Sequence, residues 1–184
     1  MTAWFTSDTH YGHENIIKHA NRPFASVQEM DEVMIQRWNS RVKKGDVVYH
    51  LGDFSWHKQQ SVNELILRRL NGQKFLVHGN HDYKNQAIMK SQSFVQITPY
   101  KEIKVEGQKI ILFHYACKVW NGSHRGSWQL FGHSHGTLER DYKIKQLDVG
   151  VDCWDFYPIS FADVAEEMEK HGQQVVDHHG RKDE

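Results

Sequence analysis

The chain has 184 residues, of which 39% are hydrophobic and 25% charged, a composition typical of one globular domain and too apolar for a disordered chain. Its 23 basic and 23 acidic residues cancel, which argues against a protein that binds nucleic acid through a basic surface, although bound divalent cations would add positive charge locally. No apolar run reaches the ~18 residues of a membrane span, and the start MTAWFTSD does not resemble a signal peptide. We therefore expect a cytoplasmic protein without membrane contact, in which Cys117 and Cys153 are free thiols.

Short runs rich in Val, Ile, Phe, Trp and Tyr alternate with helical patterns, which predicts an α/β fold. The segment EIKVEGQKIIL alternates around Glu106 and Gly107, so a hairpin is predicted there. Strands are predicted at 3–7, 46–51, 74–79, 109–115, 128–133 and 147–151.

Capping motifs predict where three helices begin. Ser26 begins the first, which ends at Gly45, Ser61 begins the second, which ends at Asn71–Gly72, and Ser160 begins the third, which ends near Gly172. A weaker helical pattern covers 84–92. From about residue 173 the chain is polar and aperiodic, so we predict one domain over 1–172 and a flexible polar tail over 173–184.

Potential metal ligands follow five of the predicted strands, each at the strand's carboxyl end. They are Asp8, His10, Asp53, Asn80, His114, His133 and His135. Ligands of α/β sheets bind at that edge, so we expect these side chains to meet. Imidazoles, carboxylates and an amide oxygen suit Mn²⁺, Fe, Ni²⁺, Co²⁺ or Zn²⁺. Seven ligands are too many for one ion, so we predict two divalent ions about 3.5–4 Å apart, an arrangement used for phosphoryl chemistry.

These residues belong to five sequence blocks that resemble, in order, the motifs of the calcineurin-like metallophosphoesterase family. The blocks are DTH (8–10), GD (52–53), GNHD (79–82), His114 and GHSH (132–135). The stretches SDTHYGHENII and DVGVDCWDFYPIS also resemble small, uncapped bacterial and phage-type members. The resemblance implies a four-layer αββα sandwich, that is, two β-sheets flanked by helices.

The resemblance further implies a role for each motif residue. Asp8, His10, Asp53 and His135 would bind the first metal, and Asp53, Asn80, His114 and His133 the second, so that Asp53 bridges. A hydroxide held by the metals would attack phosphorus, because two cations lower the pKa of a shared water from 15.7 towards ~7. His81 would not bind metal but would protonate the leaving group as general acid, with Asp82 or another carboxylate orienting it.

Candidate substrate-binding residues lie in the loop before Trp128 and near His10. Arg125 suits a phosphate oxygen, Trp120 could stack on a base, and His124 lies beside them in the same loop. The alternative for this loop is that its tryptophans pack it onto the sheet and Arg125 is solvated. His13 lies one helical step beyond His10 and could point into the site. Arg22 is a weaker phosphate candidate, and Asp152 is expected to be structural.

The function these features favour is hydrolysis of a small nucleotide-like phosphodiester, because the chain is short and neutral and has no room for a cap domain. Mn²⁺ is the favoured metal. A nuclease, or a phosphomonoesterase such as a protein phosphatase, would share the ligand set and stays an alternative. A non-catalytic metal-binding scaffold is opposed by the intact His81, since a scaffold needs no proton donor. The sequence does not indicate the oligomeric state.

Overall fold

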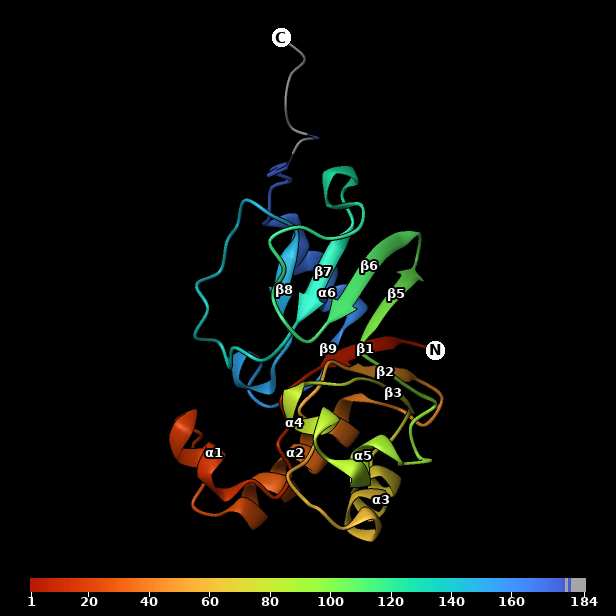
Figure 1. The fold of residues 1–184 in the computed structure, drawn as a ribbon, viewed down its shortest axis with the longest axis vertical. Coiled ribbons are helices and arrows are strands. Elements are labelled where there is room, and N and C mark those ends of the chain that lie inside the picture. The colour runs from red at the N-terminus through yellow and green to blue at the C-terminus, as the bar shows by residue number, and fades with distance from the viewer. Residues whose placement is uncertain (178, 180–184) are drawn as a thin grey trace.

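The computed structural model describes residues 1–177 and 179, in which nine strands form two mixed sheets flanked by helices (Figure 1). This is the α/β sandwich predicted from the sequence. The first sheet has the order β4-β3-β2-β1-β9 and the second the order β5-β6-β7-β8. Figure 1 shows the second sheet and α6 on one side of β1, and helices α1 to α5 on the other.

The first sheet is parallel except at one edge. Strands β1 to β4 run parallel, and β9 pairs with β1 in the antiparallel direction. The bounds are β1 Ala3–Thr6, β2 Val47–His50, β3 Gln73–Val77, β4 Gln96–Thr98 and β9 Ile159–Ser160. The three predicted strands of this sheet are confirmed, whereas β4 and β9 are too short to stand out in the sequence.

The second sheet contains the predicted hairpin. Its first two strands are antiparallel, with Val105 opposite Gln108, and the next two continue in parallel. The bounds are β5 Tyr100–Val105, β6 Gln108–Phe113, β7 Trp128–Phe131 and β8 Gln146–Asp148. Because β6 and β7 are parallel, the chain between them must travel the length of the sheet, from the carboxyl end of β6 to the amino end of β7.

Two of the three predicted helix caps form. The Ser26 hydroxyl accepts a hydrogen bond from the amide of Glu29, and Ser160 makes a complete capping box with Asp163. Ser61 does not cap, because the second helix begins at Gln60 and Gln59 is its N-cap residue. The helices are α1 Glu14–His19, α2 Val27–Arg41, α3 Gln60–Arg69, α4 Asn80–Tyr83, α5 Gln86–Met89 and α6 Phe161–Glu169, with 3-10 turns at η1 Ser123–Arg125 and η2 Val151–Cys153.

Two apolar clusters fix the strand ends in space. In one, Met34 and Trp38 of α2 and Leu67 of α3 pack with buried residues of the first sheet. In the other, residues from the two sheets pack together with α6, and Phe5 and Leu130 are fully buried there. This second cluster holds the carboxyl ends of β1 and β7 in one region, although their residues are far apart in sequence.

The beginning of the predicted tail contacts the domain. The amide of Gln174 donates to the carbonyl of Lys143 at 2.7 Å, and Gln173 Nε2 donates to the carbonyl of His124 at 3.0 Å. Residues 178 and 180–184 lie outside the described residues. Among the helices of the described part, each is too short or too polar to cross a membrane.

Candidate metal centre

Two clusters of potential metal ligands lie at the carboxyl ends of strands from both sheets. Within each, the ligand atoms all lie within 4.8 Å of one another. The first group is Asp8, His10 and His135, and the second group is Asp53, His114 and His133. Asn80, the seventh predicted ligand, lies beside the second group, with its Oδ1 3.2 Å from His114 Nε2. The structure therefore brings together all seven residues.

Asp53 lies between the two groups. Its Oδ2 is 3.7 Å from His10 Nε2 in the first group and 3.6 Å from His114 Nε2 in the second. A single carboxylate in this position can provide one oxygen to an ion in each group, as the predicted bridging role requires.

The turns that carry these ligands have an unusual backbone conformation. The φ angles are 58° at Asp8, 51° at His10, 56° at Asp53, 68° at His133 and 48° at His135. A left-handed φ is uncommon for residues other than glycine and costs on the order of 1–3 kcal/mol when it is strained. The surrounding fold therefore holds five ligand side chains in place against their local preference.

Two glycines allow the ligand-bearing turns to approach closely. A Cβ atom at Gly79 would collide with the carboxylate of Asp53 and the ring of His114. At Gly132 it would collide with the carboxylate of Asp8. The glycines in the GNHD and GHSH blocks are thus needed because the backbone touches ligand side chains there.

The first group contains polar atoms that need a partner. Asp8 Oδ1 and His10 Nε2 are buried and have no hydrogen-bond partner among the described residues. Burial raises the pKa of Asp8 to about 8 and lowers the pKa of His10 well below its ordinary range. Buried polar atoms are normally satisfied, and a neutral imidazole and a carboxylate are ligands for divalent cations. The residues present fit a metal ion.

His135 is held in place by a buried ion pair. Its Nδ1 lies 2.7 Å from Asp152 Oδ2, and the Asp152 carboxylate receives two hydrogen bonds from the Arg22 guanidinium, at 2.8 and 2.9 Å. Arg22 also donates to the carbonyl of Asp8 at 2.7 Å. Although burial opposes it, the hydrogen bond that the His135 ring donates to the Asp152 carboxylate raises the pKa of His135.

This arrangement gives Arg22 and Asp152 the role of holding His135, which the sequence did not reveal. A carboxylate on one ring nitrogen fixes the orientation of an imidazole and leaves the other nitrogen for a metal. Arg22, which was a weak phosphate candidate, is buried and engaged with Asp152 and the backbone, so it is not available to a substrate. The sequence carries no local signal for this pair, because the two residues are 130 positions apart.

The second group is supported by backbone atoms and is more open. His114 Nδ1 lies 2.7 Å from the carbonyl of Leu51, which leaves Nε2 directed at Asp53 and Asn80. His133 is exposed, and burial of part of its ring lowers its pKa.

His81 lies beside Asp53 but belongs to neither ligand group. Its Nε2 is 3.8 Å from Asp53 Oδ2, and its amide donates to Asp53 Oδ1 at 2.9 Å. The prediction that Asp82 orients His81 is not supported by the geometry. The Asp82 carboxylate is fully buried and accepts hydrogen bonds from the amides of Asp53, Phe54 and Gly79. Because those amides occupy it, Asp82 holds the two ligand turns together.

His13 does point into this region, as predicted. Its ring lies 5.4 Å from that of His10 and is stacked on Trp56 at 4.0 Å. Trp56 also lies 5.0 Å from the ring of His81. Burial lowers the pKa of His13 to about 4, so this ring is neutral. Trp56 was not predicted, because it follows the GD block in a segment without a motif.

The structure does not bring Trp120, His124 and Arg125 to the ligand groups. They lie in the loop at the opposite end of the second sheet, so the geometry does not support their prediction as substrate-binding residues. Trp120 is buried and donates from Nε1 to the carbonyl of Ser127, which packs the loop. The ring of His124 stacks on that of His179 at 3.8 Å. Arg125 lies in a hollow beside Gly107, the turn of the β5–β6 hairpin.

The parallel direction of β6 and β7 explains this placement. His114 follows β6 at the site, but the residues before Trp128 must lie at the amino end of β7, across the length of the sheet. Figure 1 shows the loop leaving β6 near β1 and the helical turn of η1 beside the far end of the hairpin.

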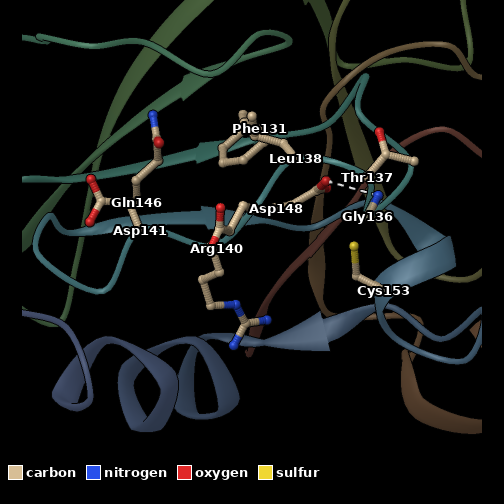
Figure 2. Close-up of a pocket in the computed structure, with 10 residues that line it drawn as sticks. Phe131, Gly136, Thr137, Leu138, Arg140, Asp141, Gln146, Asp148 and Cys153 are labelled. Atoms are coloured by element: carbon tan, nitrogen blue, oxygen red, sulfur yellow. Dashed lines mark hydrogen bonds between the residues drawn. The ribbon is translucent and has the colours of Figure 1, made fainter.

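Two clefts border the ligand groups. One, of about 410 Å³, is lined by His133, Ser134 and His135, and the other, of about 250 Å³, by Asn80 and Tyr115. A third cavity, of about 240 Å³, lies behind the GHSH turn and is lined by none of the predicted site residues (Figure 2). There Asp148 accepts a hydrogen bond from the amide of Gly136 at 3.3 Å, next to His135, and so supports the turn.

Comparisons with known proteins find relatives along most of the chain. The chain is 33% identical to the uncharacterized protein MJ1445 of Methanocaldococcus jannaschii over 91% of each chain. It is 26% identical to the Gene 66 protein of Mycobacterium phage L5, over 82% of this chain and 86% of that one. Among solved structures, the protein of unknown function AQ665 from Aquifex aeolicus matches with a TM-score of 0.72 and 28% identity, over 90% of this chain and 98% of that one.

The family follows from a match along almost the whole chain. The model of the calcineurin-like phosphoesterases matches residues 1–181, a range that includes every ligand of both groups. The five sequence blocks, the two-sheet sandwich and the two ligand clusters agree with this match. The chain belongs to the calcineurin-like phosphoesterase family, whose members are metal-dependent hydrolases of phosphate esters.

Proposed function

We propose that the protein is a phosphodiesterase that binds two divalent cations, Mn²⁺ being the favoured ion, and hydrolyses a small nucleotide-like phosphate ester. The observation that carries the proposal is the position of Asp53. Its Oδ2 lies within 4 Å of a ring nitrogen of His10, of His114 and of His81. One carboxylate oxygen thus adjoins both ligand groups and the candidate proton donor.

Each group would hold one ion. Asp8, His10 and His135 would bind the first ion, His114, His133 and Asn80 the second, and Asp53 both. When bound, two divalent cations withdraw charge from phosphoryl oxygens and lower the pKa of a water between them. The orphaned atoms of Asp8 and His10 support the assignment of the first ion, because that ion would provide their missing partner.

His81 would act as general acid. Its side chain is 39% exposed, so it can reach a substrate, and the neighbouring rings of His10 and Trp56 limit its orientations. A departing alkoxide would take its proton from the His81 ring, and a positioned proton donor typically contributes ~10²–10⁴-fold to the rate. Asp53, rather than Asp82, is the carboxylate that adjoins its ring.

The cytoplasm is the compartment we propose. Cys117 and Cys153 are free thiols, which suits a reducing environment.

A comparison of two esters tests the reaction class. With Mn²⁺, we expect bis-p-nitrophenyl phosphate to be hydrolysed with a higher kcat/KM than p-nitrophenyl phosphate, and cyclic nucleotides are the next substrates to examine. The reverse order would indicate a phosphomonoesterase. Cleavage of long DNA or RNA with a higher kcat/KM than small diesters would indicate a nuclease, and no hydrolysis of any ester would favour a scaffold.

The role of His81 is tested by its dependence on the leaving group. His81→Asn should keep both metals and lose most turnover of esters with alkyl or ribose leaving groups. The loss should be smaller with p-nitrophenolate, which needs little protonation. His124→Asn, at the far end of the second sheet, is the matched control and should behave as the wild type. Loss of metal, or equal slowing of both substrate types, would refute the assignment.

A further inference from the structure

The cleft beside Asn80 is walled by aromatic rings, and we call it the aromatic cleft. Tyr83, Phe113, Tyr115 and His78 line it. Tyr83 is 66% exposed and Tyr115 is 38% exposed. The tyrosines therefore present ring surface to solvent instead of to the core of the domain.

The aromatic cleft adjoins the second ligand group. Asn80 lines it, and the Tyr115 hydroxyl donates to Asn80 Oδ1 at 3.4 Å. The Tyr115 ring lies 4.9 Å from that of His114 and 4.7 Å from that of His133. Any molecule that fills the cleft therefore lies within one ring's width of residues proposed to hold the second ion.

The charge of the cleft is compatible with a ligand attached to a phosphate. Lys84 is the one charged side chain among its lining residues, and no carboxylate lines it. The Lys84 ammonium can attract a phosphate or donate to carbonyl oxygens on a heterocycle. His78 and Tyr83 stack on each other at 5.8 Å, so they form a wall rather than two independent side chains.

The size of the cleft restricts what can occupy it. Its volume of about 250 Å³ is below the ~300–1,000 Å³ of pockets for drug-sized ligands, which suits one ring system rather than a folded segment of another protein. The cleft at His135 is lined by Ser134, Asn21 and Thr137 and is more polar than the aromatic cleft. A flat ring therefore finds its best partners on the aromatic side.

From these contacts we infer that the aromatic cleft binds the nucleobase of the substrate, with the base stacked on Tyr83, the more exposed of the two tyrosines, and its phosphate directed to the ligand groups. This inference rests on the proposed phosphodiesterase function, since it assigns a place to one arm of the diester. Stacking accepts every base because every base has a π-face, so the cleft would favour nucleotides over alkyl esters without selecting one base strongly.

Two diesters with the same leaving group test this inference. They are p-nitrophenyl thymidine 5′-phosphate, which carries a base, and methyl p-nitrophenyl phosphate, which does not. For the Mn²⁺-loaded wild type, we expect the kcat/KM ratio of the first to the second to be well above one. Tyr83→Ala should lower this ratio about fivefold or more, which is the lower end of the effect of removing a stacking ring.

A second tyrosine provides the matched control. Tyr142 is 51% exposed and also packs on a histidine, His171, but lies outside the cleft. Tyr142→Ala should leave the ratio unchanged. If both esters are hydrolysed with equal kcat/KM, or if both variants change the ratio equally, the inference is wrong while the phosphodiesterase proposal stands.

If neither ester is hydrolysed, the proposed phosphodiesterase function is refuted. A binding measurement then still tests whether the aromatic cleft binds a nucleobase. In saturation-transfer NMR of the wild type with thymidine 5′-monophosphate, the base protons should receive more signal from the protein than the ribose protons. Tyr83→Ala should remove this difference and Tyr142→Ala should keep it. No transfer to the base in the wild type, or unchanged transfer in Tyr83→Ala, would overturn the inference.

Discussion

The two ligand groups contain the same kinds of side chain but are built differently. In the first group, Asp8 and His10 are buried, and His135 is held by the ion pair of Asp152 with Arg22. In the second, His133 is exposed, and the ring of His114 is held by a backbone carbonyl. The aromatic cleft adjoins the second group.

This difference predicts that the two groups bind their ions with different affinities. A group whose ligands are fixed before an ion arrives loses less conformational freedom on binding, so it should bind more tightly. The second group contains His133, the one exposed ligand, so its ion can exchange more readily, and this group also adjoins the aromatic cleft. We therefore expect the first group to hold its ion more firmly than the second.

Replacing Asp53 should have the largest effect, because its carboxylate adjoins ring nitrogens of both groups. Asp53→Ala should lose metal from both, and with it nearly all diesterase activity. Elemental analysis after desalting measures the loss. If one ion per chain remained at full occupancy, Asp53 would not link the groups as we describe.

Replacing Asp152 should weaken metal binding by the first group more than metal binding by the second. Asp152→Asn removes the charge that orients His135, and changes of this kind typically cost ~10–100-fold in metal affinity. Calorimetric titration with Mn²⁺ measures it.

Asp155→Asn is the matched control, because Asp155 lies in the same turn and pairs with Arg37 through a side chain that is 75% exposed. It should bind both ions as the wild type does. Equal affinities in the two variants would show that the buried ion pair does not support His135.

Asp31 should affect stability in a narrow pH range. Its carboxylate accepts hydrogen bonds from the amide of Gly12, in the turn after His10, but burial raises its pKa from 3.8 to about 6. The folded state thus favours the protonated form, and this contribution is complete below about pH 4 and is lost as the pH rises through about 6.

Asp31→Asn cannot titrate, so it should lack that loss. The difference in free energy of unfolding, wild type minus variant, should fall between about pH 4 and 6 and be flat on either side. Urea unfolding in the presence of a chelator measures it. A difference that does not change with pH would mean that the Asp31 carboxyl is solvated.

Removing the tail should have the smallest effect. A chain that ends at Gly172 keeps the hydrogen bond from the Gly172 amide to Tyr142 but loses those of Gln173 and Gln174. Each lost hydrogen bond contributes ~0.5–1.5 kcal/mol to the free energy of unfolding. The shortened chain should keep its metals and its diesterase rate, and loss of either would give the tail a role in the site.

The ligand set could be predicted because each ligand directly follows a strand whose apolar run is visible in the sequence. Parallel strands place their carboxyl ends at one edge of a sheet, so the strand rule groups Asp8, Asp53 and Asn80 at the first sheet and His114 and His133 at the second. The two edges meet because the two sheets pack together. The hairpin at Glu106 and the Ser160 cap could be predicted because each depends only on residues close to it in the sequence.

Features that depend on distant residues could not be predicted in this way. Arg22 and Asp152 meet only because β1 and the end of β8 are adjacent in space, through the bridge of Ser7 with Gly150. Arg125 lies between His114 and His133 in sequence but not in space, because a connection between parallel strands crosses the sheet. Asp82 looked catalytic in the GNHD block, but three backbone amides converge on it.

Titration of the metal-free protein with Mn²⁺ tests the central claim most directly. We predict two ions per chain with clearly different affinities, of which the tighter event is the one that Asp152→Asn weakens. One ion per chain, two events of equal affinity, or loss of the weaker event in Asp152→Asn would contradict the unequal pair of groups described here.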